Sequence, residues 1–538
     1  MRHILIRCDA SLSIGSGHVI RCRTLARELR RRGSEIIFLC RRQQGDLIDL
    51  LEQEFMVLSL PEQPLRHSND LQGRDLYKAW LGCDQRRDAA DCLESLTKSG
   101  ISKVDWLVVD HYGLDINWEN QLVTGMRACN SQPRLLVIDD LADRVHQADL
   151  LLDQNFFGNE TDQRYEQLVP ASCKTLTGPH YALLGPEYAQ LHAHVPQRNE
   201  LKRVMVYFGG VDPDDLTGRT LEALFDPRLK DIAVDVVLGH QSSHRKTVME
   251  LVTRRPLTTL HKPLSSLAGL IARADLAIGA GGTTTWERCC LGLPTIVVSI
   301  AENQNQLVKA LEQTGHVQIL GKGSSVTTRQ IRTALLAELA KPREAISKIT
   351  DGWGASRLAI AMLGAQGKIE LSPATDSDEA LLLRWANESE VRANSFSPHT
   401  ISETDHHRWF KEGIDNSNRL LFIAREISGC PIGQVRFDLQ QDEANGDIRE
   451  AQVDLSLDRC ARGHGYASSI VRLGLQAMEK CWGSKTEAVA EVLESNAASN
   501  NCFARAGFTP EKMNTSNNER FLQPVQRWRW CGDTSACP

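Results

Sequence analysis

The stretch RHILIRCDASLSIGSGH, residues 2–18, decides the fold of the first part of the chain. It opens with an apolar run, passes through a turn that contains glycine, and leads into a helical pattern carried by Val19, Cys22, Leu25 and Leu29. A buried strand, a tight turn and an amphipathic helix in this order are typical of a parallel α/β sheet.

Short apolar runs of the same kind recur along the chain. They lie at 106–109, 135–138 and 150–152, and the rhythm restarts at 204–208, 232–238, 276–278 and 295–298. This pattern predicts two doubly wound, Rossmann-like α/β domains, joined somewhere between Phe156 and Leu201. Strands of alternating polarity at 420–425, 434–439 and 452–457 then predict an α+β domain. We therefore expect domains at 1–175, 176–365 and 367–530.

Composition and charge exclude several classes of protein. The 538 residues suffice for about three domains, and 41% hydrophobic with 24% charged residues is ordinary for a globular protein. A net charge of -6 gives no basic field that would attract nucleic acid. The 15 cysteines form no Cys-x-x-Cys pair, so we expect neither a disulfide framework nor a metal site. We also expect no export signal and no membrane span, hence a cytoplasmic protein.

Polar residues follow the first strand and the strand at 106–109. Gly15 and Gly17 let the backbone approach a ligand, and His18 lies in the first helical turn, where the helix dipole disfavours imidazolium. A neutral imidazole can accept a proton from water. Asp110 and His111 should face the same crevice. As structural alternatives, His18 caps the helix or packs against the sheet, and Asp110 and His111 hold loops together.

A second polar cluster begins with AGGTTTWE, residues 280–287, after the predicted strand at 275–279. Its glycines and threonines offer backbone N–H groups and hydroxyls that suit a diphosphate. Glu287 can accept hydrogen bonds from ribose hydroxyls, and Asn303 and Gln304 follow the next strand at the same rim. The alternative is a glycine turn used only for tight strand-to-helix packing.

Residues 1 to about 360 resemble the UDP-sugar hydrolases of pseudaminic acid biosynthesis, relatives of GT-B glycosyltransferases. The motifs that carry the resemblance are RCDA (7–10), IGSGH (14–18), VDHYGLD (109–115), IDDLA (138–142), DQN (153–155), GGVD (209–212), GGTTTWE (281–287) and NQ (303–304). One departure is Gly185, where the family leads us to expect an arginine.

The resemblance implies hydrolysis of UDP-2,4-diacetamido-2,4,6-trideoxy-β-L-altropyranose to UDP and the free sugar. Water would attack the anomeric carbon with inversion and without a metal. The implied catalytic residues are His18 as general base, with Tyr112 and Asn303 placing sugar and water. The implied substrate-binding residues are Asp9, Gly15, Gly17, Arg21, Asp110, His111, Gly281, Gly282, Thr283, Glu287 and Gln304.

The C-terminal part carries RGHGYA at 462–467 after a strand, and NAASNNCFARAGF at 496–508. Backbone N–H groups in the first motif can cradle a pyrophosphate. Together the motifs make residues from about 369 to 530 resemble the GNAT family of acetyl-CoA-dependent N-acetyltransferases. The resemblance implies that acetyl-CoA is bound by Leu455, Leu457, Arg462, Gly463, Gly465, Tyr466, Ala467, Asn496 and Phe503.

Several features of this part stay open. Phe503 stands where many members have a tyrosine that protonates the leaving thiolate, so that role is unfilled. Glu450 and Asp454 are candidate bases, with surface carboxylates as the alternative. The pair His406-His407 has no companion metal motif, and we expect it in a solvated loop or helix start.

These expectations combine into a bifunctional enzyme that acts on UDP-amino sugars. The C-terminal domain would acetylate the 4-amino group of UDP-4-amino-4,6-dideoxy-N-acetyl-altrosamine, and the N-terminal part would hydrolyse the product. We expect no nucleic-acid or membrane partner, and the sequence leaves the oligomeric state open. The alternatives are a GT-B glycosyltransferase, which passes the sugar to an acceptor hydroxyl, and a sugar-nucleotide sensor with a degenerate acetyltransferase domain.

Overall fold

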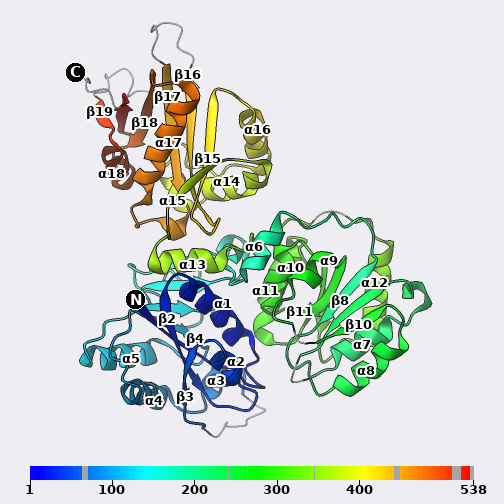
Figure 1. The fold of residues 1–538 in the computed structure, drawn as a ribbon. Helices are drawn as coiled ribbons and strands as arrows, with labels where there is room; N and C mark the ends of the chain where they lie inside the picture. Colours follow the sequence, from blue (N-terminus) through cyan, green and yellow to red (C-terminus); the bar gives the residue numbers. More distant parts are fainter. Residues whose placement is uncertain are drawn as a thin grey trace. The chain divides into compact units, whose positions relative to one another are not determined.

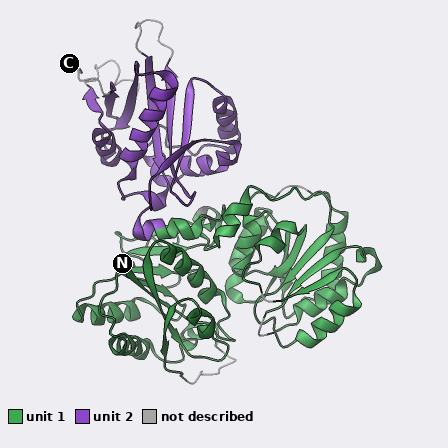
Figure 2. Ribbon diagram, viewed as in Figure 1, with its two compact units in different colours: residues 1–359 green, residues 360–538 purple. Residues whose placement is uncertain are grey.

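The computed structural model describes residues 1–63, 71–239, 242–262, 264–343, 346–440, 449–511 and 523–532. The chain divides into two compact units, residues 1–359 and 360–538 (Figure 2). Unit 1 contains two parallel sheets and unit 2 contains one mixed sheet (Figure 1). The expected fold class, two Rossmann-like α/β sheets followed by an α+β domain, is confirmed. No helix in the described ranges is long and apolar enough to cross a membrane.

The first sheet has seven parallel strands in the order β3-β2-β1-β4-β5-β6-β7. The strands are β1 Arg2–Cys8, β2 Ser34–Arg41, β3 Met56–Leu60, β4 Trp106–Asp110, β5 Arg134–Ile138, β6 Leu150–Asp153 and β7 Lys174–Thr177. The helical segments are α1 Gly17–Arg31, α2 Ile48–Glu52, α3 Gly73–Ala79, α4 Gln85–Lys98, α5 Ile116–Ala128, η1 Gly158–Glu160 and η2 Pro179–Tyr181.

Both faces of this sheet are buried. Leu5 of β1 packs into a core with Trp118 and Leu122 of α5, while its neighbours Ile4 and Ile6 are also fully buried. Successive residues of a strand point to opposite faces, so a continuous apolar run fits a sheet covered by helices on both sides. Strand β1 pairs with β2 on one side and β4 on the other, which makes it the switch point of the sheet. Ligands of open α/β sheets bind at that point.

The second sheet has six parallel strands in the order β10-β9-β8-β11-β12-β13. Its strands are β8 Arg203–Tyr207, β9 Ala233–Val237, β10 Thr258–His261, β11 Leu276–Ala280, β12 Thr295–Ser299 and β13 Gln318–Lys322. The helical segments are α6 Pro186–His192, α7 Leu216–Ala223, η3 Pro227–Leu229, α8 Arg245–Arg254, α9 Ala268–Arg273, α10 Thr284–Cys290, η4 Glu302–Gln304, α11 Asn305–Gln313 and α12 Thr328–Ala340. Helix α13, Gly354–Leu363, returns to the first sheet, where Ser356 donates to Glu28 of α1 at 3.3 Å.

This second sheet is also covered on both faces. Val204 and Val206 of β8 belong to one apolar core, and Met205 between them belongs to another. Strand β8 lies between β9 and β11, so the switch point falls between the turns after β8 and β11. The sequence predicted the glycine-threonine cluster in the second of these turns.

Unit 2 has a seven-stranded sheet in the order β14-β15-β16-β17-β18-β20-β19, antiparallel except where β17 meets β18. Its strands are β14 Glu370–Pro373, β15 Arg419–Arg425, β16 Pro431–Gln440, β17 Arg449–Leu457, β18 Thr486–Leu493, β19 Thr509–Glu511 and β20 Val525–Trp530. The helical segments are η5 Asp376–Asp378, α14 Glu379–Ala386, α15 Ser389–Ala393, α16 Glu403–Ile414, η6 Arg459–Ala461, α17 Tyr466–Trp482 and α18 Ala497–Ala506.

Candidate active sites

His18 lies at the switch point of the first sheet, in the first turn of α1, and only 7% of it is exposed. Its Nδ1 lies 2.6 Å from Oδ1 of Asp110, the last residue of β4. Asp110 also accepts two hydrogen bonds from the Arg21 guanidinium, both at 2.7 Å. Among the described residues, Nε2 of His18 has no hydrogen-bond partner. With a proton on Nδ1 facing Asp110, Nε2 is the nitrogen that faces no other described group.

The charges around Asp110 fix its ionisation. Burial alone would raise the pKa of this carboxyl, but Arg21 and His18 outweigh burial and hold its pKa well below the usual value. Asp110 is therefore a carboxylate at neutral pH, and it can keep the His18 proton on Nδ1. Arg21 also donates to Asp140 at 2.7 Å.

Tyr112 is the second predicted catalytic residue that reaches this place. Its ring meets the His18 ring edge-on, with centroids 4.5 Å apart, and Trp80 stacks against it at 5.8 Å. The Tyr112 hydroxyl donates to Asp140, and burial raises its pKa far above the usual value. Tyr112 is consequently a neutral hydrogen-bonding group. The sequence analysis assigned no role to Asp140 or Trp80, although Asp140 lies within the motif IDDLA.

Asp9 and His111 occupy the deeper layer of the same crevice. Asp9 accepts hydrogen bonds from Arg7 at 2.6 Å and from the backbone N–H of Arg41 at 2.8 Å. His111 Nδ1 accepts from the N–H of Gly113 at 3.0 Å, and its Nε2 lies 3.6 Å from Asp9. Burial lowers the pKa of His111 to about 4. Both side chains are fully enclosed and tie the turns after β1 and β4 together, which favours their structural alternative.

The turns of the two sheets approach each other within unit 1. A Cβ atom added to Gly17 would lie 3.6 Å from Thr283 Cγ2, and one added to Gly210 would lie 3.6 Å from Ser16 Oγ. Gly15 has φ +81°, a conformation that favours glycine. The turn that carries His18 therefore faces the glycine-threonine turn after β11.

The turn after β11 packs closely against α11. A Cβ atom on Gly281 would come within 2.6 Å of Val308 Cγ1 on α11, whereas one on Gly282 would meet only Gln304 Nε2 at 3.6 Å. Gln304 in turn accepts from the backbone N–H of Ile300 at 3.2 Å. The absence of a side chain at Gly281 thus lets the backbone of the turn lie close to α11, and the Gln304 side chain lies next to the turn.

Glu287 lies one helical turn beyond these glycines. Its Oε2 is buried near the Tyr188 hydroxyl, and burial raises the pKa of the carboxyl to about 7, a shift that Tyr188 offsets only in part. A buried acceptor of this kind is costly unless a ligand or water satisfies it. Asn303, in contrast, is exposed in η4, and no described contact joins it to His18 or Tyr112. The structure therefore brings Glu287 and Gln304 to the turn, with Asn303 exposed beside Gln304 in η4.

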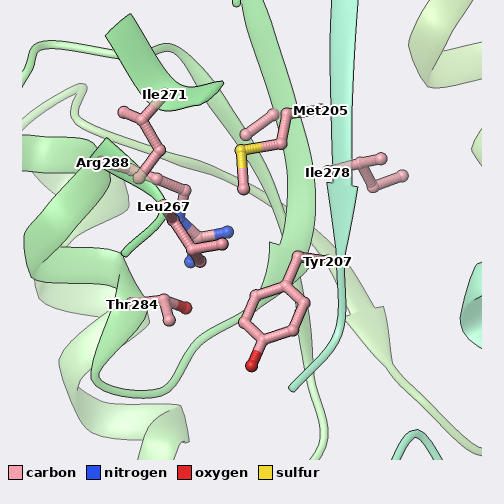
Figure 3. Close-up of a pocket in the computed structure, with 8 residues that line it drawn as sticks. Met205, Tyr207, Leu267, Ile271, Ile278, Thr284 and Arg288 are labelled. Atoms are coloured by element: carbon pink, nitrogen blue, oxygen red, sulfur yellow. The ribbon is translucent and has the colours of Figure 1, made fainter. Parts of the chain in front are cut away.

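Figure 3 shows a small pocket under α10, between that helix and strands β8 and β11. Tyr207, Thr284 and Arg288 are among its lining residues, and its volume of about 10 Å³ holds a single water molecule. Arg288 donates to the backbone oxygen of Ala280 at 2.6 Å and to Thr285 Oγ1 at 3.0 Å. This pocket is too small for a substrate, and Arg288 there links α10 to the end of β11.

A much larger cavity, of about 900 Å³, lies in unit 2. This volume suits a cofactor or drug-sized ligand. Every residue predicted to bind acetyl-CoA lines the cavity, namely Leu455, Leu457, Arg462, Gly463, Gly465, Tyr466, Ala467, Asn496 and Phe503. The structure thus brings this whole predicted set to one place.

The strand pairing explains how the cavity opens. Strand β17 pairs with β18 only over Arg449–Gln452 in the described register, while Val453–Leu457 pair with β16 alone. The second edge of Val453–Leu457 therefore offers backbone groups to a ligand. Gly463 and Gly465 both have φ +82° and precede α17, so their conformation leaves the backbone N–H groups of the turn uncovered. These features fit the amide-rich arm and the pyrophosphate of acetyl-CoA.

The resemblance implies that Arg462 binds acetyl-CoA, but its side chain contacts other residues of the protein. Its guanidinium donates to the backbone oxygen of Leu457 at 2.9 and 3.1 Å, to Glu390 at 2.6 Å, and to Glu388. It braces the end of β17 against α15. Asn496 caps α18 by accepting from the N–H of Ser499 at 3.1 Å.

The remaining candidates of unit 2 separate into cavity and surface residues. Asp454 lines the cavity and accepts from Gln434 Nε2 at 2.6 Å. Glu450 binds Arg527 at 2.6 Å and Arg529 at 3.1 Å, which favours its surface alternative. Phe503 is buried and packs edge-on against Phe508, with ring centroids 5.1 Å apart.

The interpretation of His406-His407 as a solvated pair is wrong for His406. His406 is only 3% exposed, within α16, and it lines the cavity. His407 is the exposed member and lies 2.8 Å from Glu379. The two neighbours point apart because adjacent helical residues are about 100° apart around the axis. Neither belongs to a metal cluster, and the described parts of the chain contain no group of three His, Cys, Asp or Glu side chains that could hold a metal ion.

Comparison with known proteins supports both parts of the sequence interpretation. Residues 368–509 match the family model of the acetyltransferase (GNAT) domain. The spore coat polysaccharide biosynthesis protein SpsG of Bacillus subtilis is 24% identical over 325 residues, 60% of this chain and 85% of that protein. The UDP-2,4-diacetamido-2,4,6-trideoxy-beta-L-altropyranose hydrolase of Campylobacter jejuni is 28% identical over 234 residues, 43% of this chain and 68% of that protein.

A third relative spans nearly the whole chain. The uncharacterized protein MJ1062 of Methanocaldococcus jannaschii is 23% identical over 530 residues, 96% of this chain and 98% of that protein. Among solved structures, MurG of Acinetobacter baumannii is 14% identical with a TM-score of 0.42, over 67% of this chain and 99% of that one. The chain therefore joins an N-terminal part that is similar to SpsG and to the Campylobacter hydrolase with a C-terminal domain that matches the GNAT acetyltransferase family.

Proposed function

We propose that unit 1 hydrolyses a UDP-amino sugar and that unit 2 acetylates an amino sugar with acetyl-CoA. The observation that carries the hydrolase is the His18–Asp110 pair at 2.6 Å, with His18 Nε2 unpartnered among the described residues. The substrate follows from the similarity to the Campylobacter hydrolase: UDP-2,4-diacetamido-2,4,6-trideoxy-β-L-altropyranose, or a close analogue. The domain division at 1–175, 176–365 and 367–530 belongs to the same proposal.

In this mechanism His18 Nε2 takes a proton from water, and the water oxygen attacks the anomeric carbon. The bond between that carbon and the diphosphate oxygen breaks, its electron pair leaves with UDP, and the configuration inverts. Asp110 stabilises the imidazolium that forms, since it remains ionised. Backbone N–H groups of Gly281–Thr283 donate hydrogen bonds to the diphosphate oxygens. Glu287 binds the ribose hydroxyls, and Tyr112 orients the sugar.

In unit 2, acetyl-CoA supplies the acetyl group as a thioester. The open edge of Val453–Leu457 would hold its pantetheine arm, and the turn at 462–467 would hold its pyrophosphate. The far side of the cavity is left for the acceptor. Arg392 of α15 also lines the cavity and, in the described ranges, forms no ion pair with a carboxylate. A cation in this position suits an acceptor that carries phosphate, as a UDP-sugar does.

The test uses UDP-4-amino-4,6-dideoxy-N-acetyl-altrosamine with and without acetyl-CoA, and with no other acceptor present. UDP release only with acetyl-CoA supports both activities in sequence. His18→Ala should lower UDP release by about 100- to 10,000-fold and leave acetylation of the same chain unchanged. Reaction in ¹⁸O-water should leave UDP unlabelled, because attack at carbon puts the label on the sugar.

A GT-B glycosyltransferase remains the second candidate, because the UDP site would be the same. It would release UDP only when an acceptor hydroxyl other than water is added. A sensor would bind the UDP-sugar without turnover, and His18→Ala would then change nothing that the assay measures. UDP release in acceptor-free buffer separates the hydrolase from both.

A further inference from the structure

His406 is a buried titratable group that the proposed function leaves without a task. It is 3% exposed, and both of its ring nitrogens are buried without a hydrogen-bond partner among the described residues. An imidazole buried in this way normally has a partner for each nitrogen. Because the ring lines the large cavity of unit 2, a ligand in that cavity can supply the missing partner.

The ring is held firmly in place. It stacks on Phe410, with centroids 6.2 Å apart and an interplanar angle of 13°, and its centroid lies 5.2 Å from that of Trp409. Phe410 is itself 1% exposed and belongs to the apolar core of the unit. Core packing thus fixes the ring at a defined point of the cavity wall.

The cavity lining separates into two groups by element. The predicted acetyl-CoA residues come from the end of β17, the turn before α17, and α18, whereas His406 comes with Trp409 and Asp405 from α16. Arg436 of β16 and Asp454 of β17 complete the wall near the acceptor side. His406 is thus part of the wall that the cofactor residues leave to the acceptor.

The imidazole is neutral at physiological pH. Burial lowers the pKa of His406, Glu379 at the start of α14 opposes this shift, and the neighbouring His407 adds to it. The charged groups that share its cavity are acidic and basic side chains, namely Glu390, Asp405, Asp454, Glu491, Arg392, Arg436, Arg462 and Arg505. A neutral, enclosed imidazole can both contact an amine and accept its proton.

We propose that His406 contacts the acetyl acceptor and takes the proton that its ammonium group loses. The amine nitrogen then forms a bond to the acetyl carbonyl carbon, the carbon–sulfur bond breaks, and its electron pair leaves with sulfur. The acylated nitrogen loses its second proton to the thiolate, so the products are the amide and the CoA thiol. The proton stays on the imidazole until solvent removes it. This inference rests on the proposed acetyltransferase function and adds the residue that activates its acceptor.

The test compares His406→Gln with His407→Gln, a neighbour on the same helix that does not line the cavity. With UDP-4-amino-4,6-dideoxy-N-acetyl-altrosamine as the amine probe, we expect H406Q to lower kcat/KM for the probe by about 100- to 10,000-fold. The wild-type profile should fall at acid pH with a pKa below about 6.5, and H406Q should lack this limb. H407Q should match the wild type within about threefold.

A second readout needs no turnover. In the full-length wild-type protein without acetyl-CoA, the NMR titration of the His406 ring should shift when the amine probe saturates the cavity. This measurement and the wild-type acid limb still decide the matter if H406Q does not fold, which its unfolding midpoint and acetyl-CoA binding will reveal.

Each outcome has one meaning. An H406Q variant with wild-type rate and the same acid limb overturns the role of His406 while the acetyltransferase function stands. An unchanged NMR titration at saturating probe also overturns it. A wild-type protein that acetylates neither this probe nor a panel of simple primary amines overturns the acetyltransferase function, and the role of His406 with it.

Discussion

Asp110→Asn tests the pairing that defines the candidate hydrolase site. The wild-type carboxylate accepts the Nδ1 proton of His18 at 2.6 Å and so leaves Nε2 free. An asparagine amide can donate to Nδ1 instead, which places the imidazole proton on Nε2 and removes the base. When a carboxylate that orients a catalytic histidine is lost in this way, kcat falls by about 10,000-fold. We expect UDP release to fall by that order.

The same change has a cost in stability that the structure lets us bound. Arg21 is 4% exposed and loses the charge of Asp110, but it keeps its contact with Asp140 at 2.7 Å. Breaking a buried ion pair costs about 3–5 kcal/mol. Because Arg21 keeps its second partner, we expect D110N to lose about 3 kcal/mol of unfolding free energy. The folded pKa of Asp110 is lowered, so its contribution is present above the unfolded pKa of about 3.9 and is lost as the pH falls below it. The stability difference between the two proteins should therefore shrink in acid.

Asp91→Asn is the matched control for this experiment. Asp91 is a buried carboxylate that Arg41 contacts at 3.0 Å, and Arg41 keeps a second partner in Asp88. D91N should lose similar stability but retain UDP release within about threefold. The assay measures UDP release at a temperature where both variants are folded, with acetylation by unit 2 as an internal standard. UDP release by folded D110N within tenfold of wild type refutes the role of Asp110.

Two further predictions concern the turn after β11 and the helix that follows it. Gly281→Ala should lower the unfolding midpoint, because the new Cβ would lie 2.6 Å from Val308, whereas Gly282→Ala should change the midpoint little. Equal losses in calorimetry would contradict this difference. Glu287→Gln should gain stability relative to wild type as the pH rises from about 4 to about 7, since burial raises the folded pKa of Glu287 to about 7 and wild-type stability is lost over that range. Parallel stability curves for the two proteins would show that Glu287 is not buried in solution. For the acceptor side of unit 2, Arg392→Met should raise KM for a UDP-linked amine about tenfold or more and leave KM for acetyl-CoA unchanged; an equal rise for an uncharged amine would argue against a phosphate contact.

The sequence predicted those strands and helices whose apolar pattern is complete within a few consecutive residues. The apolar runs at 106–109 and 204–208 are strands because both faces of each sheet are covered, so every residue of the run is buried. Strand β2, Ser34–Arg41, was not predicted, although it holds an apolar run at 36–40 between charged ends. Edge and short strands such as β7 and β10 carry too few apolar residues for a pattern to form.

The sequence by itself determined the fold class and the glycine turns, while its resemblance to the GNAT family identified part of the lining of the unit 2 cavity. These features depend on local order: a strand, a turn and a helix follow one another within about 15 residues, and parallel strands place their turns at one sheet edge. Only the tertiary structure decided which side chains meet across that edge. Asp140 joins Arg21 to Tyr112 through contacts that span 119 and 28 residues of chain, and Asn303 stays exposed. His406 is buried and His407 is exposed because one face of α16 packs on the core and the other faces solvent. No local pattern shows which face the rest of the chain will cover.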